Sequence, residues 1–168
     1  MSDNSTTNST ANSATNKTKV ELKVGDIAPS FTGIDQNGNQ VDLNEILKTN
    51  KVLLIFYPGD DTPGCTTQLC EIRDIYAEYQ QLGVKVYGVN QGKKDSHNKF
   101  IEKFNFPFDL IQDNNREIAQ KYGAIGKFFA ATVTKRGAFL IDNDGKILFQ
   151  HWGMQDNSKI LKLLNDKK

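Results

Sequence analysis

The run Lys51-Val52-Leu53-Leu54-Ile55-Phe56-Tyr57, followed by Pro58, constrains the fold more than any other part of the sequence. Its apolar residues follow one another without alternating with polar ones, which is typical of a parallel strand that is buried on both faces. Proline cannot donate a hydrogen bond to a neighbouring strand, so we expect the strand to end there. The run therefore predicts the central strand of a sheet that helices cover on both sides.

A helix is predicted directly after this strand. The segment Thr62-Pro63-Gly64-Cys65 has the features of a helix start, with threonine as the N-cap and proline at the first helical position. Apolar residues then recur at spacings of three and four, and Gly83 follows them, which predicts one helix over 62–82. A second apolar run at 84–89 completes a strand–helix–strand unit, whose two strands we expect to be parallel.

The rest of the chain continues this alternation. Helices are predicted at 96–104, with Ser96 as the N-cap, at 114–122 and at 158–164, and a short strand at 108–111. Two hairpins are predicted where Asn-Gly or Asp-Gly separates two apolar segments, one over 31–43 and one over 138–150. A strand–helix–strand half followed by an antiparallel half predicts an α/β domain with a thioredoxin-like fold, in which helices flank a central mixed sheet and a β-hairpin precedes it.

The composition divides the chain near residue 20. Residues 1–19 contain no Val, Ile, Leu, Phe, Trp or Tyr. A segment without apolar surface to bury cannot offset its ordering entropy, so 1–19 is predicted to be a disordered leader and 20–168 a single domain. The leader has neither the basic start nor the apolar segment of a signal peptide, and no apolar run approaches the roughly 18 residues that cross a bilayer. We therefore expect a cytoplasmic protein.

Charge and metal-binding residues exclude several classes of function. The chain has 21 Lys and Arg against 20 Asp and Glu, a net charge of +1, which argues against a nucleic-acid or membrane partner. Its two histidines and two cysteines lack metal-ligand spacing, so neither a metal nor another cofactor is expected. Two cysteines five residues apart, Cys65 and Cys70, indicate redox chemistry instead.

Cys65 lies where a nucleophile is expected. It falls in the first turn of a predicted helix that leaves the end of a parallel strand, which is where ligands gather in open α/β sheets. The free N–H groups and partial positive charge of a helix start favour a thiolate over a thiol. A thiolate attacks the O–O bond of a peroxide or the S–S bond of a disulfide. The structural alternative is a buried cysteine that only fills space in the core.

The sequence around Cys65 resembles the peroxiredoxins. Their signature Pro-x-x-x-Thr-x-x-Cys is matched by Pro58, Thr62 and Cys65. Longer matches are to the bacterioferritin comigratory protein, or Q-type, group, and they lie at 24–31, 56–58, 61–67, 70–74 and 136–142. The resemblance covers about residues 20–168. It implies a thioredoxin-like fold and a thiol-dependent peroxidase that reduces hydrogen peroxide and organic hydroperoxides in antioxidant defence.

The resemblance also assigns roles to single residues. Cys65 is the implied peroxidatic cysteine, which attacks the peroxide and becomes a sulfenic acid. Thr62 would offer its hydroxyl to the thiolate and the peroxide, and Pro58 would shield the thiolate from water. Arg136 would hold both by charge-assisted hydrogen bonds. The structural alternatives are an N-cap for Thr62, a strand terminator for Pro58 and a solvated surface residue for Arg136.

Cys70 matches the resolving cysteine of the Q-type group. The resemblance implies a disulfide between Cys65 and Cys70 that thioredoxin or a similar dithiol protein reduces, and it implies a monomer. On an ideal helix, Cα atoms five residues apart are about 8.6 Å from each other. A disulfide needs a Cα separation within about 7 Å, so the helix must first unwind. Alternatively, Cys70 is a helix-face cysteine and the resolving thiol comes from another molecule.

Two other functions stay open from the residues alone. One is a thiol–disulfide oxidoreductase of the same fold, although that class usually has two residues between its cysteines and this chain has four. The other is a chaperone or interaction module with inert cysteines. Asp60 and Asp61 are interpreted as turn residues, His97 and His151 as ordinary polar residues and Arg73 as an ion-pair residue.

Overall fold

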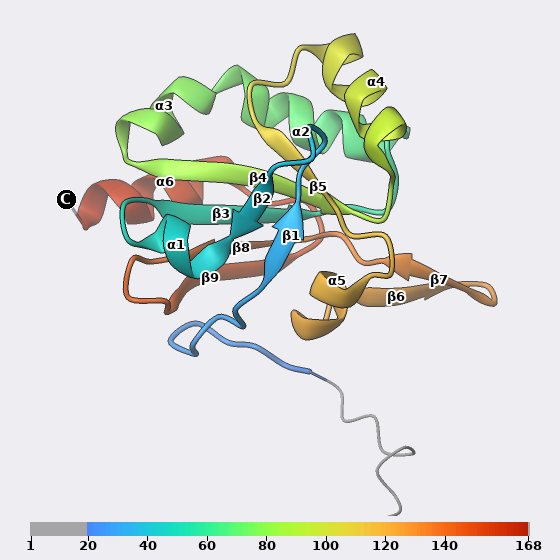
Figure 1. The fold of residues 1–168 in the computed structure, drawn as a ribbon. Coiled ribbons are helices and arrows are strands. Elements are labelled where there is room, and N and C mark those ends of the chain that lie inside the picture. The colour runs from blue at the N-terminus through green and yellow to red at the C-terminus, as the bar shows by residue number, and fades with distance from the viewer. Residues whose placement is uncertain (1–19, 168) are drawn as a thin grey trace, which may run out of the picture.

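The protein is described by a computed structural model over residues 20–167, so the predicted leader 1–19 lies outside the described residues. A central sheet has the strand order β5-β4-β3-β8-β9, and helices cover both of its faces (Figure 1). Its strands are β3 (Lys51–Phe56), β4 (Val84–Asn90), β5 (Asp109–Gln112), β8 (Gly137–Ile141) and β9 (Ile147–Trp152). The predicted run at Lys51 is thus the central strand.

Pairing within the sheet is mixed. Strand β3 runs parallel to β4 and antiparallel to β8, while β4 and β5 are parallel and β8 and β9 are antiparallel. A separate antiparallel hairpin, β1 (Thr32–Ile34) and β2 (Gln40–Asp42), precedes the sheet in the chain. The predicted parallel unit, the C-terminal hairpin and the N-terminal hairpin are therefore confirmed.

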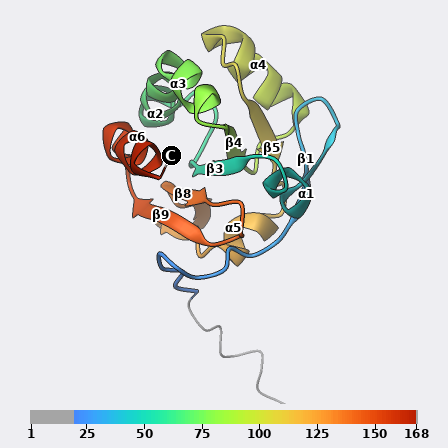
Figure 2. The ribbon, with the colours of Figure 1, turned by 90° about the vertical axis from the view of Figure 1, so that its left-hand side faces the viewer.

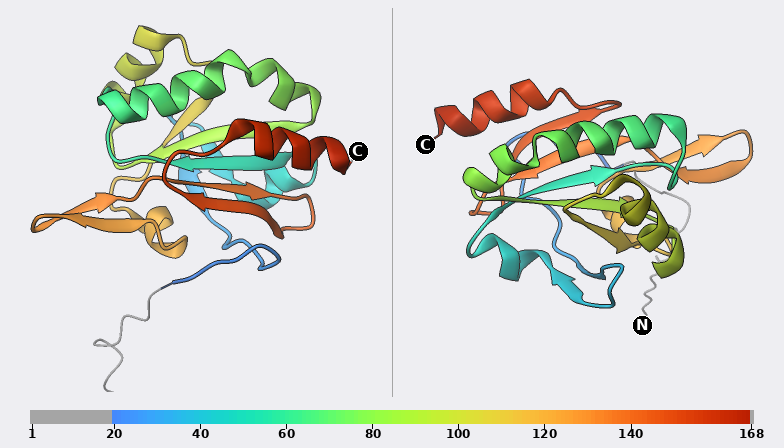
Figure 3. Two further views of the ribbon diagram at one scale, coloured as in Figure 1. Left: turned by 180° about the vertical axis from the view of Figure 1, so that it is seen from behind. Right: turned by 90° about the horizontal axis from the view of Figure 1, so that it is seen from above.

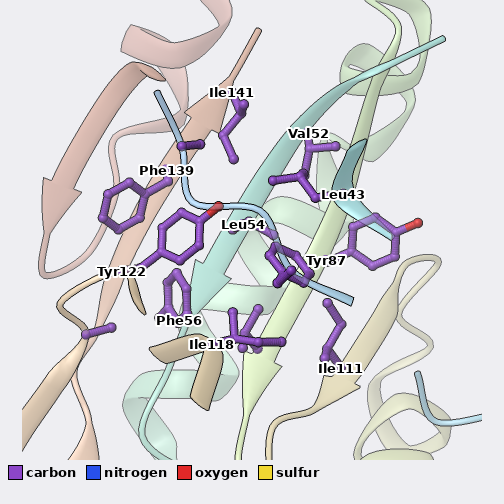
Figure 4. Close-up of a cluster of buried hydrophobic side chains, with 14 of the residues drawn as sticks. Leu43, Val52, Leu54, Phe56, Tyr87, Ile111, Ile118, Tyr122, Phe139 and Ile141 are labelled. Carbon is purple, nitrogen blue, oxygen red and sulfur yellow. The ribbon is translucent and has the colours of Figure 1, made fainter. Parts of the chain in front are cut away.

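Residues of β3 alternate between two hydrophobic cores, one on each face of the sheet. Leu53 and Ile55 pack with α2 (Pro63–Asp74), α3 (Tyr76–Gln81), α4 (Lys94–Phe104) and α6 (Asn157–Asp166). Leu54 and Phe56 pack on the other face with α1 (Leu43–Leu47) and α5 (Glu117–Lys121), in the cluster that Figure 4 shows. Figure 2, which views the molecule from its side, shows helices on both sides of the strands. Burial on both faces explains the uninterrupted apolar run.

One predicted helix is two helices in the structure. The prediction over 62–82 was wrong at Ile75, where φ is −119° and ψ is 17°, so that α2 ends and α3 begins. The N–H of Ile75 bonds the carbonyl of Ile72, three residues back, instead of continuing the four-residue ladder. Ile72 and Tyr79 are buried in the same core on either side of the break, so the apolar periodicity continues through it.

Other boundaries also differ from the sequence prediction. Helix α4 begins at Lys94 rather than at Ser96, with Lys93 at the N-cap position, and the Ser96 hydroxyl donates to the side chain of Asp60. Helix α5 is shorter than 114–122 because Asp113 accepts from the N–H groups of Ile118 and Ala119 and so starts the helix later.

A third hairpin was not predicted. It consists of β6 (Ile125–Phe128) and β7 (Ala131–Thr134), and Figures 1 and 3 show it projecting from the body of the molecule. Phe129 occupies the turn with a φ of 59°, where Asn or Gly is usual, so the turn signal was missing from the sequence. Among residues 20–167, no helix has the length and apolar character that crossing a membrane requires.

Gly88 of β4 leaves room for the side chains of Leu110 and Tyr57, which pack over it. A Cβ atom there would lie 2.5 Å from Leu110 Cδ2 and 3.1 Å from Tyr57 Cε1. We expect Gly88→Ala to lower the free energy of unfolding by about 1–3 kcal/mol, because overpacking forces neighbouring side chains to shift. Urea denaturation measures this, with Gly126→Ala as the control because its Cβ would meet Val133 at an ordinary 3.5 Å. Equal stabilities of the two variants would contradict the prediction.

Candidate active site

Cys65 lies at the start of α2, directly beyond the carboxyl end of β3. Thr62 has the extended backbone of an N-cap, with φ −99° and ψ 153°, and Pro63 is the first residue of the helix. The helix start predicted from the sequence is therefore confirmed. The side chain of Cys65 is fully buried and packs in the core with Leu69 and Tyr57. Its sulfur thus lies at the positive end of a helix and out of contact with bulk water.

Arg136 brings a guanidinium group to this sulfur. It lies between β7 and β8, and its Nη1 is 3.5 Å from Cys65 Sγ and 2.8 Å from Gln68 Oε1. The guanidinium also lies over Gly64, where an added Cβ would be 2.9 Å from Nη2. The residue before the cysteine therefore has to be small. The structure brings together Cys65 and Arg136, two of the residues that the sequence singled out.

Gln68 is a site residue that the sequence analysis missed. It is fully buried, and its Nε2 donates to Gln155 Oε1 at 3.0 Å while its Oε1 accepts from Arg136. Gln155 is itself buried, in the segment between β9 and α6. A chain of hydrogen bonds thus runs from Gln155 through Gln68 to Arg136 and Cys65. The available signal was a glutamine three residues after the cysteine, on the same face of the helix.

Thr62 and Pro58 lie in the loop between β3 and α2. The Thr62 side chain does not cap α2; its hydroxyl donates to the carbonyl of Gly59 at 3.0 Å. The sequence analysis was thus correct about the N-cap position of Thr62 but not about a side-chain cap. Pro58 is the second residue after the end of β3, and its carbonyl accepts from Gln91 Nε2 at 3.1 Å. Both residues help to define the loop that leads to Cys65.

Cys70 lies on α2, which is unbroken from Cys65 to Cys70, and both cysteines are free. The Cys70 side chain is partly buried. Burial raises the pKa of its thiol, with Arg73 acting in the opposite direction and Asp74 in the same one, so the group is a neutral thiol at pH 7. Because the two residues lie on an intact helix, a bond between them requires α2 to change shape.

Two further predictions concern neighbouring polar residues. Arg73 pairs with Asp74 at 3.0 Å and donates to the carbonyl of Phe104 at 2.7 Å, so its interpretation as an ion-pair residue is confirmed. His97, interpreted from the sequence as an ordinary polar residue, has a fully buried side chain that bonds Asp60. Sequence spacing did not reveal this contact between residues 37 positions apart. Among residues 20–167, no group of three or more His, Cys, Asp or Glu is placed to hold a metal ion.

Comparisons with known proteins agree on one family. Residues 24–150 match the model of the AhpC/TSA family. Over 130 residues the chain is 41% identical to peroxiredoxin Bcp of Escherichia coli K12, which covers 75% of this chain and 83% of that protein. It is 35% identical over 129 residues to the chloroplastic peroxiredoxin Q of Triticum aestivum, covering 77% of this chain but only 58% of the plant protein.

A similar fold is found among solved structures. The crystal structure of peroxidoxin BcpB from Mycobacterium tuberculosis superposes with a TM-score of 0.81 and 28% sequence identity, covering 88% of this chain and 99% of that one. The predicted thioredoxin-like fold is thereby confirmed.

Proposed function

The chain belongs to the AhpC/TSA family and is a peroxiredoxin, a thiol-dependent peroxidase, and from this premise we propose that its reaction cycle runs through Cys65 and Cys70. The observation that carries the proposal is the 3.5 Å contact between Arg136 Nη1 and a cysteine sulfur at a helix N-terminus. A guanidinium and a helix start both favour the thiolate, which is the nucleophilic form.

The first step is the attack of the Cys65 thiolate on the terminal oxygen of a hydroperoxide. An S–O bond forms and the O–O bond breaks, so the cysteine is oxidised to a sulfenic acid and the peroxide is reduced. The leaving oxygen takes a proton and departs as water from hydrogen peroxide, or as an alcohol from an organic hydroperoxide. Charge builds up on both oxygens as the bond breaks, and fixed donors beside them lower the barrier.

Arg136, Thr62 and Pro58 support this step. Arg136 supplies fixed N–H donors, and its bond to Gln68 holds the guanidinium beside Cys65. Thr62 at the N-cap turns its hydroxyl from the Gly59 carbonyl toward the peroxide when the substrate binds. Pro58 lacks an N–H group, so it contributes an apolar wall that excludes water from the thiolate.

Cys70 resolves the sulfenic acid. Its thiol attacks the sulfur of Cys65, an S–S bond forms and water leaves. The first turns of α2 have to unwind for this reaction, and Gln68 then gives up its bonds to Arg136 and Gln155. Thioredoxin or a similar dithiol protein reduces the disulfide, being oxidised to its own disulfide, and α2 forms again.

The setting of this activity is also a proposal. We propose that the enzyme acts in the cytoplasm, and its resemblance to the Q-type group supports a monomer. The composition of 1–19 supports a disordered leader ahead of a catalytic domain at 20–168. Size-exclusion chromatography with light scattering tests the monomer.

Replacing the nucleophile tests the proposed function directly. We expect Cys65→Ser to reduce hydroperoxide turnover with a thioredoxin system to background, because a serine hydroxyl is not ionised at neutral pH. Circular dichroism checks that the variant stays folded. Turnover near the wild-type rate in folded Cys65→Ser protein would refute the role of Cys65.

The proposed role of Arg136 has its own test. We expect Arg136→Ala to slow the reaction with peroxide about 100-fold, because the transition state loses a fixed N–H donor. Stopped-flow kinetics measure the rate. The matched control is Arg73→Ala. It also removes a guanidinium, but one that pairs with Asp74 and donates to the Phe104 carbonyl rather than to Cys65. Equal effects of the two substitutions would contradict the assignment.

The proposed unwinding predicts a change in hydrogen exchange. Backbone amides of 62–70 should exchange faster in the oxidised protein than in the dithiol form, while those of α6 should not change.

The role of Cys70 is tested by substitution. Cys70→Ser should keep the fast first reaction with peroxide, lose thioredoxin-linked turnover and leave Cys65 open to over-oxidation. A disulfide-linked dimer as the main oxidation product of the wild type, without a Cys65–Cys70 bond in peptide mapping, would refute an intramolecular disulfide.

A further inference from the structure

A group of hydrogen-bonding side chains around the buried ring of His97 lies next to the loop that carries Pro58 and Thr62. We call it the Asp60 cluster, and it consists of Tyr57, Asp60, Ser96 and His97. Asp60 Oδ1 accepts from the Tyr57 hydroxyl at 2.7 Å, and its Oδ2 accepts from the Ser96 hydroxyl at 2.6 Å and lies 2.7 Å from His97 Nδ1. The His97 side chain is 0% exposed and that of Asp60 is 6% exposed. The proposed reaction cycle uses neither group.

Each ring nitrogen of His97 faces an oxygen atom that accepts hydrogen bonds. Nδ1 faces the Asp60 carboxylate, and Nε2 lies 3.0 Å from the carbonyl oxygen of Ile111. A neutral imidazole has one N–H, so one of its nitrogens would direct a lone pair at an acceptor. Only a ring with protons on both nitrogens satisfies both contacts.

The surroundings of Asp60 agree with an ion pair. Burial opposes ionisation of this carboxyl, but the hydrogen bond and positive charge of His97 outweigh it, with help from Ser96 and Tyr57, so its pKa lies below the ordinary value. The pKa of Tyr57 is raised by burial and by the charge of Asp60, so the phenol keeps its proton and stays a donor. A charge buried this deeply requires a partner, and each of Asp60 and His97 supplies it to the other.

The other groups around the His97 ring are neutral. They are the Ile111 carbonyl from β5, the Ser96 hydroxyl from the same helix, and Gly92 after β4, where an added Cβ would lie 2.9 Å from the ring and 3.0 Å from the Asn90 side-chain oxygen. Asp60, from the loop before α2, supplies the charge that the ring contacts.

Asp60 lies in the middle of the loop between β3 and α2, so its ion pair with His97 can hold that loop in place. Before it, the carbonyls of Tyr57 and Pro58 are held by Asn90 and Gln91. After it, Asp61 has a left-handed backbone with φ 55°. Asp60 itself is bonded to Ser96 and His97 of α4, and Asp61 after it pairs with Lys103 of the same helix at 2.9 Å, so the loop is fixed to α4 just before the segment that has to unwind.

We propose that His97, as an imidazolium paired with Asp60, is a positioning residue for the peroxidase reaction. The pair holds the loop so that Pro58 and Thr62 stay beside Cys65, and it restricts unwinding to the residues after Asp60. The proposal rests on the proposed function of Cys65. Breaking the pair should therefore slow the peroxide step and speed disulfide formation.

Nitrogen NMR of the reduced protein labelled with [15N]histidine tests the protonation. The chain has two histidines, and exposed His151 serves as the internal reference. At pH 7 we expect proton-bearing signals from both ring nitrogens of His97 in the wild type, and loss of one of them in Asp60→Asn. A neutral His97 ring in the wild type at pH 7 would overturn the proposal, whatever the enzyme assays show.

Kinetics test the positioning. His97→Gln removes the charge and one of the two donors, and we expect it to slow the oxidation of Cys65 by peroxide about tenfold or more. The same variant should form the Cys65–Cys70 disulfide faster than the wild type, and amides of 57–61 should exchange faster. His151→Gln, the same substitution at the exposed histidine, should change none of these rates.

Further variants separate positioning from loss of stability. Leu47→Ala destabilises the protein through the core on the opposite face of the sheet, and it should leave the peroxide step unchanged. If His97→Gln does not fold, Asp60→Asn, which keeps the shape of the side chain, is measured in its place with the same expectation. A peroxide rate within twofold of the wild type in whichever variant folds would overturn the proposal. If Cys65 is not the nucleophile, the result that shows it is a different one, namely turnover at the wild-type rate in Cys65→Ser.

Discussion

A sulfur atom buried at the start of a helix is the constraint on which the rest of this site depends. Burial disfavours an anion unless charges and hydrogen-bond donors surround it. Cys65 is fully buried, with the N-terminus of α2 on one side and Arg136 Nη1 3.5 Å away. The approach of the guanidinium requires the glycine at position 64, and its orientation depends on Gln68. Segments that lie far apart in the chain thus meet at one atom.

The site combines two opposing requirements. Reaction with peroxide requires a rigid loop and a fixed guanidinium, whereas a disulfide between two cysteines on one helix requires that helix to open. Residues on both sides of the start of α2 are held by contacts with the rest of the domain. The carbonyls of Tyr57 and Pro58 are bonded by Asn90, the last residue of β4, and by Gln91 after it, and Leu69 packs deep in the core. Between them lies Gly64, a residue that weakens a helix, directly before the reactive cysteine.

Much of the fold was predictable because local sequence patterns carry it. The uninterrupted apolar run before Pro58 predicted a strand buried on both faces, and Asn-Gly and Asp-Gly predicted two hairpins that the structure contains. The predictions that were wrong also concerned short segments. The break at Ile75 leaves the apolar periodicity intact, and the turn of β6 and β7 places Phe129 where no sequence rule expects it. At Ile75 the helix break does not interrupt the apolar pattern, because residues on both sides of it are buried in the same core, and at Phe129, which is 91% exposed, the usual turn residues are absent.

The sequence by itself determined the central strand, the helix start at Thr62 and the five-residue separation of Cys65 and Cys70, because each depends on neighbours along the chain. The tertiary structure alone decided which polar groups meet. Arg136 reaches Cys65 across 71 positions, Gln68 reaches Gln155 across 87, and His97 is buried against Asp60. The physical reason is that periodicity specifies which face of an element is apolar. The partner of a buried polar side chain is specified only when the elements pack together.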